Sequence, residues 1–444
     1  MSPRYFVVAL MGVALLQTHL AYALGLMEAY DAALQNDSAY RAALAEGQSG
    51  QEHKIIGRSY LMPSMSANYT LNANFADIAT ENNNGAVASE YRKYWSQAGS
   101  IQARQPLFNL DSLARYRQGI AKTKASETEL SLSRQDLILR LFSLYATANY
   151  AEDQLALAVA QRDSYTELQR TNNRLFAQGE GTQTDMIETQ AKFDLSEAQL
   201  LESQDSLSNA RNALSSMVGR EVSQLSPLRE NFRVLPMQPA SFEEWKTIAL
   251  EQNLELATQR YAIEVAQQEI NKTKSGHAPR LDGIASLSRN KSDTTSTIKQ
   301  DAMVTSAGVQ LTIPIFSGGA VNAATRQARA QHEKAQANLQ TKTNEVVSEL
   351  HKQFSAVSTS VLRIEALAKS ADSARLLIDA TQKSVKGGIR TNLDVLNAQR
   401  QLFEVKRDLA LARYNYLIGY LRLRKAAGNL SVNNLQAVAD YFEK

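Results

Sequence analysis

One stretch of this chain occurs twice, and it restricts the possible folds more than any other feature. Residues 179–190 reappear as residues 388–399, with glycine, threonine, aspartate and glutamine in register 209 positions apart. After each copy, an apolar residue recurs at every seventh position over five heptads. This period predicts helices that supercoil around their neighbours, in a chain made of two similar halves. The heptad residues are Met186, Phe193, Leu200, Leu207 and Leu214 in the first copy, and Val395, Leu402, Leu409, Tyr416 and Leu423 in the second.

Each copy lies at the turn of a predicted helical hairpin. A long helix runs to a glycine-containing tip, and a shorter helix returns from it. Residues 320–386 contain neither glycine nor proline, so these 67 residues can form one helix of about 100 Å at about 1.5 Å per residue. This segment has a heptad seam of its own, formed by Leu350, Val357, Ile364, Ala371 and Ile378. Gly179 and Gly388 are interpreted as helix-ending residues with positive φ. The predicted bounds are 107–178 and 320–386 for the long helices, and 182–219 and 391–428 for the return helices.

Before each hairpin the hydrophobic period changes to two. Residues 64–75 alternate between polar and apolar without exception, which indicates a strand with one apolar face. Strands of about ten alternating residues joined by polar loops are typical of transmembrane β-hairpins. Each pair of strands follows a predicted helix that a proline, Pro63 or Pro279, terminates. The predicted bounds are 24–61 and 242–277 for these helices, and 64–76, 91–105, 281–289 and 303–315 for the strands.

The N-terminal residues have the pattern of a secretory signal peptide. Arg4 precedes an apolar run, and the small residues before Leu24 predict cleavage between Ala23 and Leu24. The apolar run has about eleven residues, whereas a helix needs about 20 to cross a bilayer. No later segment is long and apolar enough, so a membrane part would have to be a β-barrel. The predicted division is 1–23 signal peptide, 24–219 first repeat, 220–241 connector, 242–428 second repeat and 429–444 polar tail.

Composition argues against several classes of function. The formal net charge is only +3 and there is no basic run, so nucleic acid is not an expected partner. The absence of cysteine excludes disulfides, thiolate metal sites and thiol catalysis. The five histidines show no metal-ligand spacing, and no phosphate-loop or nucleophile motif occurs. The sequence therefore predicts neither an enzyme nor a bound metal or cofactor.

Four strands cannot close a barrel by themselves. In lipid, the open edges of such a sheet would leave backbone groups without hydrogen bonds, at several kcal/mol each. The strands must therefore pair with those of other subunits. Two copies would supply eight strands and three would supply twelve, and only the larger number leaves an open lumen. The helices carry charged side chains throughout and belong in water. The predicted fold is mainly α, with duplicated long hairpins and four strands per chain that contribute to a shared transmembrane β-barrel.

Three segments resemble those of the TolC-type outer-membrane channels of Gram-negative bacteria. They are residues 314–319 (PIFSGG), 388–396 (GIRTNLDVL) and 412–418 (ARYNYLI), and the resemblance covers nearly the whole mature chain. It implies a homotrimer with one twelve-stranded barrel in the outer-membrane lipid and a long periplasmic α-barrel. It also implies docking to an inner-membrane transporter, of the ABC or another class, through a periplasmic adaptor protein.

The same resemblance implies roles for residues near the two tips. An adaptor would contact the tips, and residues just beyond them would narrow the periplasmic mouth of the closed channel. In this view Asp394 forms a ring of three carboxylates, Asn397 adds no charge, and Arg390 pairs with Asp185. The alternative is that each aspartate only caps its return helix. The predicted tip residues are Gly179, Gly181, Thr182, Gly387, Gly388 and Thr391, and the predicted gate residues are Asp185, Arg390, Asp394 and Asn397.

Two classes of function remain. The first is an export channel, serving either type I protein secretion or drug efflux; the short C-terminal tail favours protein secretion. The second is a periplasmic adaptor or envelope coiled-coil protein without a pore. An adaptor would show one helical hairpin flanked by β-rich domains, and not two hairpins with four alternating strands.

Overall fold

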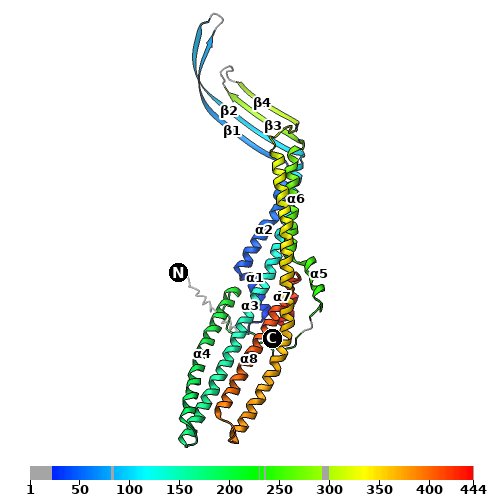
Figure 1. Ribbon diagram of the computed structural model, residues 1–444. Coiled ribbons are helices and arrows are strands. Elements are labelled where there is room, and N and C mark those ends of the chain that lie inside the picture. Colours follow the sequence, from blue (N-terminus) through cyan, green and yellow to red (C-terminus); the bar gives the residue numbers. More distant parts are fainter. Residues whose placement is uncertain (1–22, 82–84, 230, 235–236, 293–299, 444) are drawn as a thin grey trace, which may run out of the picture.

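The structure, a computed structural model, describes residues 23–81, 85–229, 231–234, 237–292 and 300–443. The molecule is elongated, with a β-sheet at one end and two helical hairpins at the other (Figure 1). The first half contains α1 (Leu26–Asn36), α2 (Ser38–Ser59), β1 (Ser64–Glu81), β2 (Val87–Phe108), α3 (Leu110–Ala177) and α4 (Gln183–Val218). The second half contains α5 (Phe242–Gln252), α6 (Leu254–Lys274), the 3-10 turn Ser275–His277, β3 (Arg280–Ser292), β4 (Gln300–Thr312), α7 (Ala320–Lys386) and α8 (Asn392–Ala426), and α9 (Val432–Ala439) follows.

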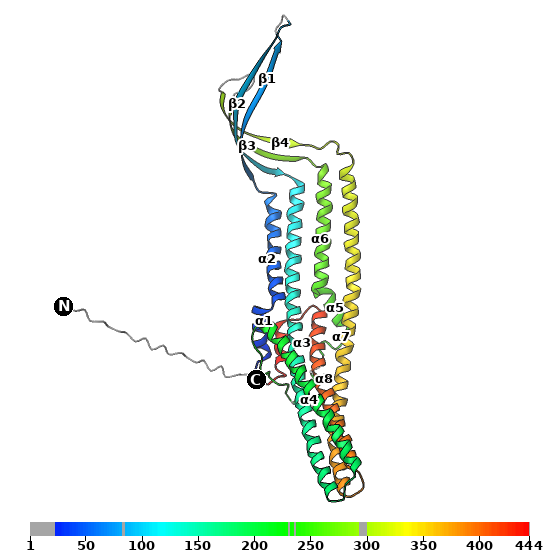
Figure 2. The ribbon, with the colours of Figure 1, turned by 90° about the vertical axis from the view of Figure 1, so that its left-hand side faces the viewer.

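The two long helices, α3 and α7, connect the sheet to the tips (Figure 2). On α3, the sheet-side half packs against α2 and the tip-side half against α4, and α7 packs in the same way against α6 and α8. The predicted heptad seams are buried along these contacts, which confirms the coiled-coil interpretation. Buried seam residues include Leu200, Leu207 and Leu214 on α4, Leu350, Val357, Ile364 and Ala371 on α7, and Leu409, Tyr416 and Leu423 on α8.

The helix that precedes each strand pair is broken, so the prediction of one continuous helix was wrong in both halves. Asp37 separates α1 from α2, and Asn253 separates α5 from α6. Both side chains are buried and cap the second helix: Asp37 accepts a hydrogen bond from the Tyr40 N–H (2.6 Å), and Asn253 accepts one from the Leu256 N–H (3.1 Å). An N-cap residue needs an extended backbone, which interrupts the helix.

The four strands form one antiparallel sheet in the order β1-β2-β3-β4, so β2 and β3 join the two halves. Three strands run longer than predicted, and β4 is shifted to 300–312, with Ile313–Ile315 following it. Because β2 continues to Phe108, α3 begins at Leu110 and not at residue 107. Asn109 caps α3 by accepting hydrogen bonds from the N–H groups of Asp111 (3.0 Å) and Ser112 (3.3 Å).

The register of the sheet confirms the predicted two-faced strands. Paired residues of antiparallel strands lie on the same face, and most apolar residues of the four strands lie on one side of the sheet. That side also carries Lys93, Gln97, Arg289, Lys291, Asp301 and Thr305, while Ile284 and Val304 lie on the other side. We call the side with most of the apolar residues the apolar face and the other side the polar face. The apolar face carries Met65, Ala67, Tyr69, Leu71, Ala73, Phe75, Trp95, Ile101, Ala103, Ala285, Leu287, Met303, Ala307, Val309 and Leu311. The polar face carries Ser64, Ser66, Asn68, Thr70, Asn72, Asn74, Ser96, Ser100, Gln102, Arg104, Ser286, Ser288 and Ser306.

The C-terminal segment is not the polar tail that was predicted. It forms α9 and packs back onto the middle of the molecule, where Leu435, Val438 and Phe442 are buried. The Phe442 ring meets the Tyr145 ring edge-on at a centroid distance of 5.2 Å. α9 packs against α1 and α8, and Phe442, which follows α9, packs against α3.

The predicted signal peptide lies almost entirely outside the described residues. Of the residues at the predicted cleavage point, Ala23 is exposed and Leu24 is buried. The Leu24 N–H donates to the Gln224 carbonyl (2.9 Å), and the Leu24 carbonyl accepts from the Tyr145 hydroxyl (2.9 Å). The segment that begins at Leu24 is therefore part of the core in the middle of the molecule.

In the part of the chain that the structure describes, none of the helices is both long and apolar enough to cross a lipid bilayer.

Candidate functional site: the helical tips and the groove above them

The two hairpins end in tips of the same backbone structure, residues 178–182 and 387–391, at the end of the molecule farthest from the sheet (Figures 1 and 2). Gly179 and Gly388 have φ values of 75° and 70°, which confirms the predicted left-handed conformation. The N–H groups of Glu180 and Ile389 each donate to a carbonyl five residues back, at 3.0 Å. The duplication therefore extends to the hydrogen bonds that terminate both long helices.

The tips differ at the position after Glu180 and Ile389, where Gly181 of the first tip corresponds to Arg390 of the second. A Cβ atom on Gly181 would lie 2.9 Å from the Phe176 nitrogen, so the first tip has no space for a side chain there. The second tip carries the exposed Arg390 at the equivalent position. The two tips consequently present different surfaces, one without a side chain and one with a guanidinium group.

Both predicted gate aspartates cap their return helices. The Thr182 N–H donates to Asp185 Oδ2 (3.3 Å), and the Asp185 N–H donates to the Thr182 hydroxyl (3.1 Å). In the second tip, the N–H and hydroxyl of Thr391 both donate to Asp394 Oδ2, at 2.9 Å and 3.0 Å. Each threonine–aspartate pair forms a capping box, which confirms the capping interpretation.

These hydrogen bonds also affect the charge of Asp394. The Thr391 backbone N–H and the Thr391 hydroxyl, aided by the nearby Arg390 charge, lower the pKa of the Asp394 carboxyl group below its usual value. Asp394 therefore remains a carboxylate while it caps α8. Capping leaves its negative charge available at the tip.

The predicted pairing of Arg390 with Asp185 does not occur inside the single chain. Among the described residues, no ion pair joins the Arg390 and Asp185 side chains. The charge of Arg390 instead helps to lower the pKa of Asp394. Asn397 lies one turn further along α8 and is exposed. The structure thus brings Arg390, Thr391 and Asp394 together and leaves Asp185 on the other hairpin.

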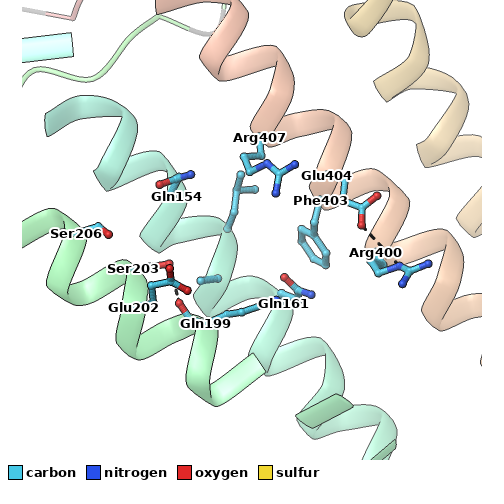
Figure 3. A pocket seen from close by; sticks show the side chains of 12 residues that line it. Gln154, Gln161, Gln199, Glu202, Ser203, Ser206, Arg400, Phe403, Glu404 and Arg407 are labelled. Atoms are coloured by element: carbon cyan, nitrogen blue, oxygen red, sulfur yellow. Dashed lines mark hydrogen bonds and ion pairs between the residues drawn. The ribbon is translucent and has the colours of Figure 1, made fainter. Parts of the chain in front are cut away.

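A polar groove between α4 and α8, with α3 as its floor, lies above the tips (Figure 3). Its volume is about 350 Å³. Arg400 and Glu404 line its α8 side and lie 3.7 Å apart, while glutamine and serine side chains line the α4 side. We call it the α4–α8 groove; its residues are Gln154, Leu157, Ala158, Gln161, Gln199, Glu202, Ser203, Ser206, Arg400, Phe403, Glu404 and Arg407.

This groove was not predicted from the sequence, because charged side chains on a helix usually form a solvated face. A signal was present, since Gln154 and Gln161, like Arg400 and Arg407, are seven residues apart and so share one side of a helix. The helices that border that side, however, are determined by the tertiary structure. Because the groove is rich in hydrogen-bonding groups, it suits a helix of another protein better than it suits a small apolar molecule.

The two repeats also match one known family. Residues 29–220 and 245–429 match the family described as "Outer membrane efflux protein". The chain belongs to this family. The two matched blocks coincide with the two halves of the fold and leave out most of the connector.

Individual relatives cover nearly the whole chain. The alkaline protease secretion protein AprF of Pseudomonas aeruginosa is 38% identical over 95% of this chain and 88% of its own length. The proteases secretion protein PrtF of Dickeya chrysanthemi is 35% identical over 95% and 92%. The outer membrane protein TolC of Escherichia coli is 29% identical over 96% and 86%.

Solved structures support the fold. The Campylobacter jejuni CmeC outer membrane channel gives a TM-score of 0.76, with 17% identity over 94% of this chain and 90% of that one. The channel OprN gives 0.77, with 16% identity over 91% and 90%. With the family established, the chain is an exit channel of the Gram-negative outer membrane with a periplasmic helical tunnel. The alternative of an adaptor without a pore is excluded.

Proposed function

We propose that three copies of this chain form one channel that exports proteins by type I secretion. The observation that carries the trimer is the open sheet, whose outer strands β1 and β4 each leave one edge unpaired in the single chain. Three such sheets supply twelve strands, enough to enclose an open lumen. Exposed leucines on the helices, such as Leu201 on α4 and Leu376 on α7, supply apolar surface for neighbouring subunits.

The two faces of the sheet suggest its orientation. The apolar face would meet lipid, since Tyr69, Leu71 and Phe75 are exposed in the single chain. The polar face, with its serine and asparagine side chains, would line the lumen. In this orientation each face of the sheet meets an environment of matching polarity, because lipid favours apolar side chains and a water-filled lumen favours polar ones.

Relatives named for protein secretion support a protein substrate. The protease secretion proteins AprF and PrtF are 38% and 35% identical to this chain. The relatives named for efflux, BepC of Brucella suis and SrpC of Pseudomonas putida, are 24% and 23% identical over a similar share of it. We infer that the cargo is an exported protein of the protease class. Drug efflux is the second candidate, and the family description supports it.

The tips and the α4–α8 groove are the proposed contact sites for a periplasmic adaptor, which would connect the channel to an inner-membrane transporter of the ABC class. The adaptor-contact residues would be Gly179, Gly181, Thr182, Gly387, Gly388 and Thr391. At the mouth, Arg390 of one hairpin would approach Asp185 of a neighbouring hairpin in the closed trimer, while Asp394 and Asn397 would face the opening. Opposite charges on adjacent hairpins support this gate.

One experiment separates the two substrate classes. The chain is expressed in a Gram-negative strain that lacks its own channel of this family but keeps the adaptor and transporter of a protease secretion system and those of a drug efflux pump. We expect extracellular protease activity to appear and drug resistance to stay at the level of the deficient strain. Restored drug resistance without any secreted protein would overturn the secretion proposal, and a stable monomer in detergent would overturn the trimer.

A further inference from the structure

A hollow of about 400 Å³ interrupts the apolar face of the sheet. It lies over Gly99, which has no side chain to fill the row that it shares with Tyr69, Arg289 and Met303. A Cβ atom on Gly99 would lie 3.6 Å from the Tyr69 ring, which is an ordinary contact, so the backbone does not require glycine here. The side chains around the hollow are mainly apolar: Ala67, Tyr69, Ile101, Leu287 and Met303, with Arg289 at its edge.

Basic side chains border the hollow on the side away from the helices. Lys291 lies on the same face one row beyond Arg289, and Lys93 lies two rows further out. Asp301 forms an ion pair with Arg289 (2.8 Å) and compensates one of these three cations. Both lysines are exposed, and no ion pair with either lysine is found among the described residues. The three cations and Asp301 together carry two positive charges, on a face that also holds the polar Gln97 and Thr305; the acidic Asp77 lies one row beyond Lys93.

Aromatic side chains mark the level of Lys93. Phe75, Tyr91 and Trp95 are all on the apolar face, with 68%, 63% and 63% of their surfaces exposed. The Lys93 ammonium group lies 5.7 Å from the Phe75 ring centre and 5.5 Å from the Tyr91 ring centre. Aromatic girdles of membrane β-proteins lie at the level of the lipid headgroups. Lys93 is thus at headgroup depth, the hollow is at acyl-chain depth, and Lys291 lies between them, one row from the hollow.

We propose that this part of the sheet binds one phosphorylated, acylated lipid of the outer leaflet. An acyl chain would fill the hollow over Gly99, and the phosphate would lie between Lys93 and Lys291, with Arg289 beside it. The cations would not attract a neutral lipid, and a free phosphate has no acyl chain to fill the hollow. The proposal rests on the proposed orientation of the apolar face toward lipid.

The test uses the purified trimer in detergent and diphosphoryl lipid A as the added lipid. Binding is measured by native mass spectrometry, with phosphatidylethanolamine and inorganic phosphate as comparison ligands. Each lysine near an anionic headgroup strengthens binding about fivefold, so Lys93→Gln with Lys291→Gln should weaken lipid A binding about thirtyfold. Gly99→Leu should also weaken lipid A binding, because it fills the hollow while it leaves every charge in place.

Matched controls lie on the polar face of the same strands. Arg92→Gln removes a cation next to Lys93, and Gly308→Leu adds a side chain where nothing lies within 4 Å. Both controls should bind lipid A like the wild type. Equal binding of lipid A and phosphatidylethanolamine, or an equal loss in the controls, would overturn the site.

Channel conductance of the same samples separates this outcome from a failure of the proposed function. A conducting trimer that does not prefer lipid A refutes only the lipid site. A protein that forms neither a trimer nor a channel refutes the proposed function, and with it the lipid site.

Discussion

At the scale of single residues, the helical part contains a pair, the buried Tyr414 and the partly buried Asp153, that is costly to charge. The Tyr414 hydroxyl on α8 donates to Asp153 Oδ2 on α3 at 2.9 Å. Burial raises the pKa of the Asp153 carboxyl group, although the Tyr414 hydrogen bond partly opposes this, and burial also raises the pKa of Tyr414. Because the folded protein binds the Asp153 proton more tightly than the unfolded chain does, this group favours folding at low pH. Its contribution declines as the pH rises from about 4 through the raised pKa.

Substitution of Asp153 tests this sign. Asp153→Asn keeps an acceptor for Tyr414 without a charge, so the variant should be more stable than the wild type at neutral pH and similar near pH 4. Asp153→Ala removes the acceptor and should lower the free energy of unfolding by about 1–3 kcal/mol. Thermal unfolding of the purified protein at both pH values measures this. An Asn variant that is less stable than the wild type at neutral pH would show that the carboxylate is stabilised in the fold.

The proposed gate is also tested by single side chains. Arg390→Ser with Asp185→Ala should raise single-channel conductance severalfold in a planar bilayer, because three weak pairs together can bias the closed–open equilibrium. Asp394→Asn should instead weaken cation selectivity and block by multivalent cations. If the double variant conducts like the wild type while the trimer stays intact, the two residues are only solvated tip charges.

At the scale of elements, capping residues decide where the helices begin and end. Asp37 and Asn253 are 216 positions apart, the same offset as Pro63 and Pro279, so the helix breaks belong to the duplication. Asn253 also donates to the Ala426 carbonyl at the end of α8 (2.9 Å). A single side chain thus begins α6 and binds the C-terminus of a helix from the neighbouring hairpin.

Loss of this side chain should be measurable. Asn253→Ala removes the cap and the bond to Ala426, and we expect a loss of about 1–2 kcal/mol in the free energy of unfolding. Asn415→Ala, at an exposed position on α8, is the matched control and should change stability little. Denaturant unfolding followed by circular dichroism measures both. Equal midpoints for the two variants would contradict the capping argument.

At the scale of the whole molecule, the two faces of the sheet are the main determinant of how the channel would sit in lipid. Leu71 and Thr70 are neighbours on β1 and lie on opposite faces. The pair therefore provides the simplest test of the proposed orientation.

Arginine at these two positions should have opposite consequences. A charge on the lipid-facing side costs up to about 2–4 kcal/mol at the bilayer midplane and less toward the headgroups, so Leu71→Arg should reduce insertion into the outer membrane. Thr70→Arg should leave insertion intact and change mainly the conductance. Membrane fractionation and planar-bilayer recording distinguish the two. Equal damage from both substitutions would show that the assigned faces are wrong.

Local patterns in the sequence determined much of this protein. The heptads identified the buried seams of α4, α7 and α8, the alternation from Ser64 onward identified the two-faced strands, and the repeated glycine, threonine and aspartate identified the tips with their caps. These features were predictable because each depends on residues within a few positions of one another, through helix period, strand period or capping hydrogen bonds.

Only the tertiary structure decided which surfaces meet. The pairing of β2 with β3, the burial of Phe442 against α3, and the α4–α8 groove all join segments more than 100 residues apart. Periodicity shows which face of an element is apolar, but it does not show what covers that face. Phe442 illustrates the reason: it lies in a mostly polar terminal segment, and it is buried because Tyr145 and Phe142 on α3 leave a place for its ring.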